Sequence, residues 1–363
     1  MRSFLCFLLL AFLFPAQILM AEPKEPPDQT NEHEEQGLGV NSAILYDLTT
    51  NTILFEQNAD ARIQPASLTK VMSMFLALDQ ISQGHLRFDS PVLVSKKAAS
   101  EGGSRMGIRA GEEIRLGELL LGMAVSSGND ASYAVAEFVG GSNEAFIQAM
   151  NAKAKRLGMY NTCFCTPNGL PMQGQYTTAR DMLILARAYL KRYPWALSLH
   201  NTRVLKHLDY VSWNKNPLLN QYPGCDGLKT GWVRASGYNM IFTAQRENHR
   251  LLAVILGAPD PLHRGVEACR MLDAGFLVCA RKEESVLDAL SHLPFENYRL
   301  DLHKNAHEAV QRYGYVSSGL KTNKRQVKAR PASHAGRKVA QRQNKERRSA
   351  KHKTPSKKKK RHS

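Results

Sequence analysis

A serine followed three residues later by a lysine, Ser67 and Lys70, could perform nucleophilic chemistry. The mostly apolar run at 71–78 predicts a helix that starts near the pair and stops by Gly84. Because residues i and i+3 share a helix face, the hydroxyl and the amine would lie one turn apart. Such an amine can accept the serine proton if burial or a nearby cation lowers its pKa. Alone, this short pattern also fits a helix with an ordinary surface lysine.

Two further short motifs follow in order. Residues 127–129 are Ser-Gly-Asn, and residues 229–231 are Lys-Thr-Gly. S-x-x-K, S-D-N and K-T-G, in this order, form the motif set of class A β-lactamases and penicillin-binding proteins. Taken singly, the second motif also fits a helix-capping turn and the third a strand end. Together, the three predict one site assembled from three distant segments.

The motifs resemble those of the low-molecular-mass penicillin-binding proteins, the serine-type D-alanyl-D-alanine carboxypeptidases of peptidase family S11. The S-G-N form of the middle motif is typical of that family. The resemblance covers residues 38 to 280, and it includes the segments 111–113, 119–132, 157–162, 168–171, 226–231 and 237–239. It implies a serine carboxypeptidase that acts on peptidoglycan stem peptides and that β-lactams inhibit as substrate mimics.

The elements that must position these motifs follow from periodicity and turn residues. Strands are predicted at 42–48, 52–57, 227–232, 238–244 and 250–256, and helices at 116–125, from 131, at 143–157, from 178 and at 263–280. Residues 95–112 are expected to be loop. This order of strands, helices and strands predicts an α+β domain with an antiparallel sheet. The resemblance implies the β-lactamase/transpeptidase-like fold, a five-stranded antiparallel sheet flanked by helices plus an all-helical lobe, with the site between them.

The residues themselves suggest a division of roles. Ser67 is the expected nucleophile, which would form an acyl-enzyme, and Lys70 is the expected proton acceptor. Burial and Lys229 would together lower the pKa of Lys70 so that its amine is neutral near pH 7. The position of Ser67 at a helix start would also supply one backbone N–H to an oxyanion.

The resemblance implies the remaining roles. Ser127 would relay a proton to the leaving amine, and Asn129 would hydrogen-bond the substrate backbone or the lysine. Lys229 and Thr230 would bind the terminal carboxylate of the substrate. The backbone N–H of Trp232 would complete the oxyanion hole. By its distance from the last strand, Arg264 matches a basic residue that the family places near that carboxylate, and an ordinary surface arginine fits the same position.

The net charge of +17 is carried by one end of the chain. Residues 321–363 hold 18 Lys or Arg and one acid, so the rest of the chain is neutral. We expect this basic tail to be disordered. It has no aromatic residue for base stacking, so no specific nucleic-acid binding is predicted. Contact with an anionic membrane or wall polymer is one hypothesis for the tail, and a solvated tail without function is the other.

The N-terminus predicts export. Residues 1–21 fit a signal peptide with Arg2, an apolar core at 4–14 and cleavage after Ala21, and an uncleaved anchor is the alternative. Residues 22–37 form a flexible leader, 38–283 the penicillin-binding/DD-peptidase catalytic domain and 284–320 a short extension. Export places the protein in the periplasm or cell envelope, with membrane association left open. Once Cys6 leaves with the signal, five cysteines remain, without the spacing of a metal site, and neither metal nor cofactor is expected.

Three alternative functions remain open. The same machinery could cleave stem-peptide cross-links as an endopeptidase. A serine β-lactamase would need a deacylating glutamate after the helical lobe, and the chain has no acid between Leu157 and Tyr176. An envelope polyanion-binding protein acting through residues 321–363 belongs to a different class.

Overall fold

The computed structural model describes residues 37–302 and 316–318. The predicted signal peptide, all but the last residue of the leader and the basic tail lie outside these residues, so the predictions made for them remain predictions.

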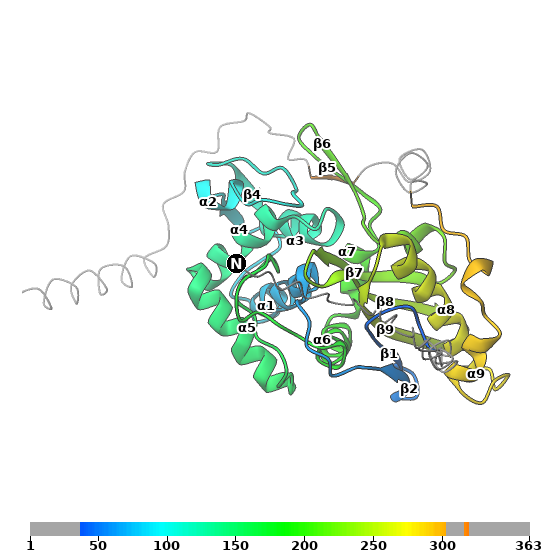
Figure 1. Cartoon of the computed structure of the whole chain (residues 1–363). Coiled ribbons are helices and arrows are strands. Elements are labelled where there is room, and N and C mark those ends of the chain that lie inside the picture. The colour runs from blue at the N-terminus through cyan, green and yellow to red at the C-terminus, as the bar shows by residue number, and fades with distance from the viewer. Residues whose placement is uncertain (1–36, 303–315, 319–363) are drawn as a thin grey trace, which may run out of the picture. The chain divides into compact units, whose positions relative to one another are not determined.

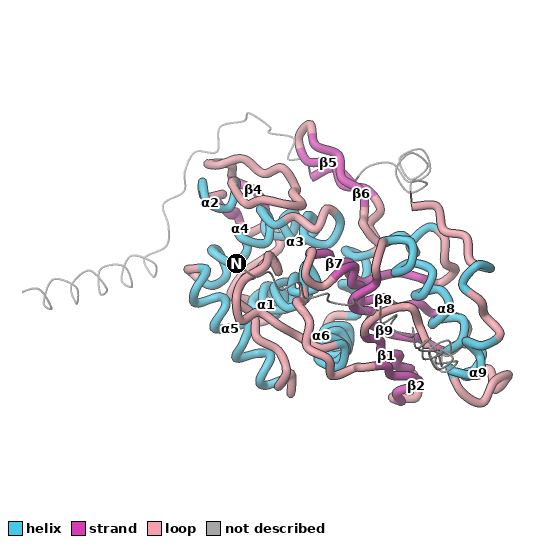
Figure 2. The backbone as a smooth tube through the Cα atoms, in the orientation of Figure 1, coloured by secondary structure: helices cyan, strands magenta, loops and turns pink. Residues whose placement is uncertain are grey.

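A five-stranded antiparallel sheet, in the order β2-β1-β9-β8-β7, forms the centre of the described domain (Figures 1 and 2). Its strands are β1 Ser42–Asp47, β2 Thr52–Gln57, β7 Cys225–Val233, β8 Gly237–Arg246 and β9 His249–Ala258. The N-terminal hairpin therefore pairs with the third strand of the C-terminal meander. This confirms the predicted five-stranded sheet and places β7, which carries Lys-Thr-Gly, at one edge.

Both faces of the sheet are buried, as alternation along β9 shows. Leu252, Val254 and Leu256 belong to one apolar core, whereas Leu251 and Ile255 belong to the other. Successive side chains of a strand point to opposite faces, so one strand supplies both cores. Helix α6 (Ala179–Arg192) packs on one face and α8 (Pro261–Cys279) on the other.

The helical lobe contains α1 (Lys70–Ser82), α2 (Lys96–Ala99), α3 (Leu116–Val125), α4 (Asn129–Gly140) and α5 (Asn143–Leu157). The boundaries of α3 and α5 agree with the predicted ranges. A short sheet of β3 (Pro91–Leu93) and β4 (Glu113–Arg115) lies at its rim. Two expectations were wrong in detail: α2 interrupts the predicted loop, and α4 starts at Asn129 rather than at Ala131.

A hairpin that periodicity did not predict lies between α6 and β7. It consists of β5 (Val204–His207) and β6 (Tyr210–Trp213), and β10 (Val316–Ser318) pairs with β5 in parallel. The other elements are α7 (Leu197–His200), α9 (Val286–Ser291) and the 3₁₀ turns Ala66–Thr69, Pro194–Ala196, Pro217–Asn220 and Phe295–Asn297. None of the helices within residues 37–302 has both the length and the apolar character needed to cross a bilayer.

Candidate active site

Ser67 lies in the 3₁₀ turn Ala66–Thr69, which leads directly into α1. Two glycines pack against this turn. A Cβ on Gly231 of β7 would lie 3.0 Å from the backbone nitrogen of Ser67, and a Cβ on Gly169 would overlap the carbonyl of Ala66. Ala66 itself has a φ of 47°, in the left-handed region. Such a backbone conformation persists only where its surroundings fix it, so the position of the serine is set by β7 and by the loop around Gly169.

Lys70 is fully buried, and its amine has three hydrogen-bond partners. Its Nζ lies 2.8 Å from Ser67 Oγ, 2.7 Å from Asn129 Oδ1 and 2.7 Å from the carbonyl oxygen of Asn168. Burial lowers the pKa of Lys70 well below its ordinary value, and the positive charge of Lys229 lowers it further, against an opposing effect of Asp130. A neutral amine in contact with a hydroxyl can accept its proton.

Lys229 on β7 faces the second serine. Its Nζ lies 2.9 Å from Ser127 Oγ and donates a hydrogen bond to the carbonyl of Thr230 at 2.7 Å. Burial, followed by the charges of Arg264 and Lys215, lowers the pKa of Lys229 to about 7. Ser127 has a φ of 58°, so it is, after Ala66, the second residue at the site that adopts the left-handed conformation without being glycine.

Arg264 is a buried cation, and the surface-arginine alternative is therefore wrong. Its Nε has no hydrogen-bond partner among the described residues, and its guanidinium lies 5.8 Å from the ring centroid of Tyr238. Burial lowers its pKa to about 10. An unsatisfied buried donor favours an anionic ligand that accepts its hydrogen bond.

These groups surround a cavity of about 270 Å³. None of the residues that line it is acidic; they are Ser67, Ser104, Ser127, Lys215, Thr230, Gly231, Trp232, Tyr238, Pro261 and Arg264. Because β7 is the edge strand, its alternate backbone N–H groups point away from β8, toward the turn that carries Ser67. The cavity therefore combines serine hydroxyls, the cations of Lys215 and Arg264, and backbone donors.

The structure thus brings together all the residues that sequence reasoning selected. Ser67, Ser127, Thr230, Trp232 and Arg264 line the cavity, and the others lie behind it: Lys70, Asn129 and Lys229. Asn129 bonds the lysine rather than lining the cavity, and its Nδ2 donates to the carbonyl of Gly102 at 2.6 Å.

Several supporting residues were missed. Asp130 accepts hydrogen bonds from the backbone N–H groups of Met106 and Gly107 at 2.9 Å, and so anchors the loop that carries Ser104. The contact of Asn168 with Lys70 uses a backbone carbonyl, which no side-chain pattern can indicate. Lys215 follows the β5–β6 hairpin, which was not predicted, so nothing in the sequence indicated that Lys215 lines the cavity.

This geometry defines a serine hydrolase of the transpeptidase-like, penicillin-binding fold. The family model of D-alanyl-D-alanine carboxypeptidases, peptidase S11, matches residues 29–260. The D-alanyl-D-alanine carboxypeptidase DacF of Bacillus subtilis is 38% identical over 283 residues, covering 76% of this chain and 71% of that protein. The chain belongs to the peptidase S11 family.

Two further relatives bear on the function. A D-alanyl-D-alanine endopeptidase of Pseudomonas aeruginosa is 30% identical over 277 residues, covering 75% of this chain and 88% of that protein. The crystal structure of penicillin binding protein 5 from Haemophilus influenzae aligns with a TM-score of 0.64 and 31% identity, covering 66% of this chain and 71% of that one. The fold prediction and the family prediction are both confirmed.

Proposed function

We propose that this enzyme removes the terminal D-alanine from peptidoglycan stem peptides through an acyl-enzyme on Ser67. The observation that carries the proposal is the contact of Ser67 Oγ with the buried amine of Lys70, whose pKa is lowered. This pair lies beside a cavity lined by the cations Lys215 and Arg264. A substrate that ends in a free carboxylate next to a scissile amide fits this arrangement of charge. β-Lactams, which offer an amide carbonyl and a carboxylate, would acylate the same serine.

Acylation begins when Ser67 Oγ attacks the carbonyl carbon of the penultimate residue and its proton passes to Lys70 Nζ. The backbone N–H groups of Ser67 and Trp232 would donate hydrogen bonds to the oxyanion of the tetrahedral intermediate. Arg264 and Thr230 would bind the terminal carboxylate, which can accept the hydrogen bond of Arg264 Nε, a donor with no other partner among the described residues. These contacts orient the amide against the nucleophile.

Collapse of the intermediate breaks the C–N bond and requires a proton on the leaving amine. Ser127 lies in the cavity with its Oγ 2.9 Å from Lys229 Nζ, so it can donate its proton to that amine and regain one from the lysine. D-Alanine then departs, and water hydrolyses the acyl-enzyme, with Lys70 again available as the base. No step uses a metal or a cofactor.

The cavity argues against the β-lactamase alternative. Efficient deacylation in class A enzymes uses a glutamate. Here the segment that approaches Lys70 offers the backbone carbonyl of Asn168, and no acid lines the cavity. We infer a slowly released β-lactam acyl-enzyme, and therefore a target of these compounds rather than an enzyme that destroys them.

The test is a paired assay of purified protein. We expect release of free D-alanine from a synthetic pentapeptide ending in D-Ala-D-Ala and no rapid turnover of a chromogenic cephalosporin, since no deacylating acid lines the cavity. A second assay uses a cross-linked dimer of stem peptides as the substrate. Mass spectrometry of its products distinguishes endopeptidase activity, which cleaves the cross-link, from carboxypeptidase activity. Fast cephalosporin hydrolysis without D-alanine release would overturn the proposal.

The pKa of Lys229 predicts an unusual pH profile. In the free enzyme, kcat/KM should rise with pH as Lys70 loses its proton and fall as pH passes about 7, where Lys229 loses its own. A bound carboxylate favours the charged lysine, so the alkaline limb of kcat should lie at higher pH than that of kcat/KM. Steady-state kinetics from pH 5 to 10 would measure both limbs, and coincident alkaline limbs would contradict this role of Lys229.

We propose that the enzyme works in the cell envelope, where its substrate is found. Support comes from the predicted signal peptide at 1–21 and from the family. The basic tail at 321–363 would add electrostatic contact with anionic lipid or wall polymer. Deletion of residues 321–363, followed by cell fractionation, tests that contact. If the shortened protein were still associated with the envelope to the same extent, the proposed contact would be wrong.

A further inference from the structure

Three potential metal ligands from different segments converge at the end of the sheet that carries the β1–β2 and β8–β9 turns. Asp47 ends β1, His249 begins β9 and Cys279 ends α8. One ligand atom from each lies within 4.8 Å of both of the others. Residues this far apart in the sequence do not form a short metal-binding motif, so the sequence could not indicate this cluster.

The interatomic distances are close to those of a metal centre. Asp47 Oδ2 lies 2.9 Å from His249 Nδ1 and 3.8 Å from Cys279 Sγ. A tetrahedral Zn²⁺ binds sulfur at about 2.3 Å and nitrogen or oxygen at about 2.0–2.2 Å, which separates its ligand atoms by about 3–4 Å. Small side-chain movements would therefore bring all three atoms onto one ion.

The carboxylate is already held in place. Asp47 Oδ1 accepts a hydrogen bond from the backbone N–H of Thr49 at 2.8 Å, and Oδ2 accepts one from the hydroxyl of Thr50 at 2.9 Å. Such outer hydrogen bonds orient a carboxylate ligand without occupying all its lone pairs.

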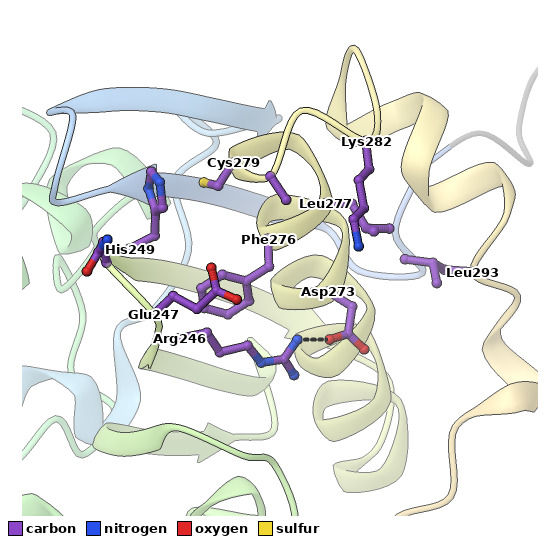
Figure 3. A pocket seen from close by; sticks show the side chains of 11 residues that line it. Arg246, Glu247, His249, Asp273, Phe276, Leu277, Cys279, Lys282 and Leu293 are labelled. Carbon is purple, nitrogen blue, oxygen red and sulfur yellow. Dashed lines mark ion pairs between the residues drawn. The ribbon is translucent and has the colours of Figure 1, made fainter.

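An open position faces a cavity. His249 and Cys279 line a cavity of about 470 Å³, together with Arg246, Asp273 and Lys282. Figure 3 shows the sulfur of Cys279 directed toward the imidazole of His249 at one end of it, while Arg246 is engaged by Asp273 at 2.8 Å. Water can therefore reach the fourth coordination position.

We propose that Asp47, His249 and Cys279 form a binding site for Zn²⁺, with water as the fourth ligand. A thiolate, an imidazole and a carboxylate form the mixed ligand set that this borderline-soft ion accepts. One thiolate and one carboxylate neutralise the two charges of the ion, which limits the cost of burying it. The bound ion ties β1, β9 and α8 to one another.

Binding of Zn²⁺ would release one proton, from the thiol of Cys279. In the metal-free protein, the thiol of Cys279 carries a proton and donates a hydrogen bond to Asp47 Oδ2. Coordination replaces that proton with the Zn–S bond and releases it to solvent. The neutral imidazole binds through Nδ1 and carries its proton on Nε2. No electrons are transferred.

The site is separate from the catalytic cavity. β9 runs from His249 to Ala258, and Ala258 pairs with Tyr238, which lines the catalytic cavity. Nine residue steps along a strand span about 30 Å. The metal should therefore stabilise the fold without changing acylation of Ser67.

The experiment titrates reduced, full-length, tag-free protein with Co²⁺ as a spectroscopic probe and then displaces it with Zn²⁺. We expect one thiolate-to-cobalt charge-transfer band, saturating at one equivalent and lost in Cys279→Ser and in His249→Gln. Saturating Zn²⁺ should raise Tm by about 5 °C in the wild type and not in these variants.

The matched control is Cys163→Ser with Cys165→Ser, which removes two neighbouring thiols outside the proposed site and should retain the band. Circular dichroism verifies folding, and His249→Gln, at a partly exposed position, covers the case in which Cys279→Ser does not fold. Absence of the band from the wild type, its survival in folded Cys279→Ser or in His249→Gln, or its loss from the folded control would overturn the proposal.

Discussion

Replacing Lys70 with methionine should slow acylation by a β-lactam about 10³-fold, since positioned acid–base catalysis contributes about 10²–10⁴-fold and Lys70 Nζ is the amine that contacts Ser67 Oγ. Methionine has nearly the volume of lysine, so the buried position remains filled. Stopped-flow or gel-based measurement of the acylation rate constant with fluorescent penicillin measures the effect.

A matched control exists on α5. Among the described residues, Lys153 is the buried lysine that lies outside the site; it is hydrogen-bonded to Asp79, and Lys153→Met should lower stability but leave the acylation rate of the folded protein unchanged. If Lys70→Met acylated at the wild-type rate, the amine would not be the base. If both variants lost acylation equally, the effect would be structural.

Replacing Lys229 with methionine should lower kcat/KM for the peptide by about 10²-fold, because a hydrogen bond to a charged group contributes about 1.5–3 kcal/mol. The substitution removes both the donor to Ser127 Oγ and a positive charge that lies directly behind the cavity. Acylation by a β-lactam, which also presents a carboxylate, should fall in parallel.

A pH profile separates this role from a merely structural one. Below pH 7 the charge of Lys229 disfavours a second charge on Lys70, so its removal should raise the pKa of Lys70 and move the acidic limb to higher pH. The alkaline limb near pH 7 should vanish. Lys215→Met, which removes a charge from the same cavity without touching Ser127, should move the acidic limb less. Unchanged limbs in Lys229→Met would contradict the assignment.

Motif order and strand patterning predicted most of the site. Ser67 and Lys70 lie within four residues, so helix geometry alone places them together, and the strand predicted at 227–232 carries Lys229. The prediction of Arg264 depended on counting from that sheet, and only the structure shows that it is a buried cation.

What could not be predicted depends on backbone and long-range contacts. The carbonyl of Asn168 reaches Lys70 because its loop folds under the Ser67 turn, and a backbone acceptor has no residue type to recognise. The β5–β6 hairpin, which precedes Lys215, is short and only partly apolar, so periodicity over four residues is too weak a signal. Asp47, His249 and Cys279 meet only because the sheet pairs β1 with β9.

The most direct test of the central claim is peptide mapping by mass spectrometry after brief exposure to benzylpenicillin. The wild type should carry one penicilloyl adduct, on the peptide that contains Ser67. Ser67→Ala should carry none, whereas Ser127→Ala, which changes a second serine of the cavity, should still form the adduct on Ser67, only more slowly. An adduct on any other residue of the wild type, or one retained by folded Ser67→Ala, would contradict an acyl-enzyme at this serine.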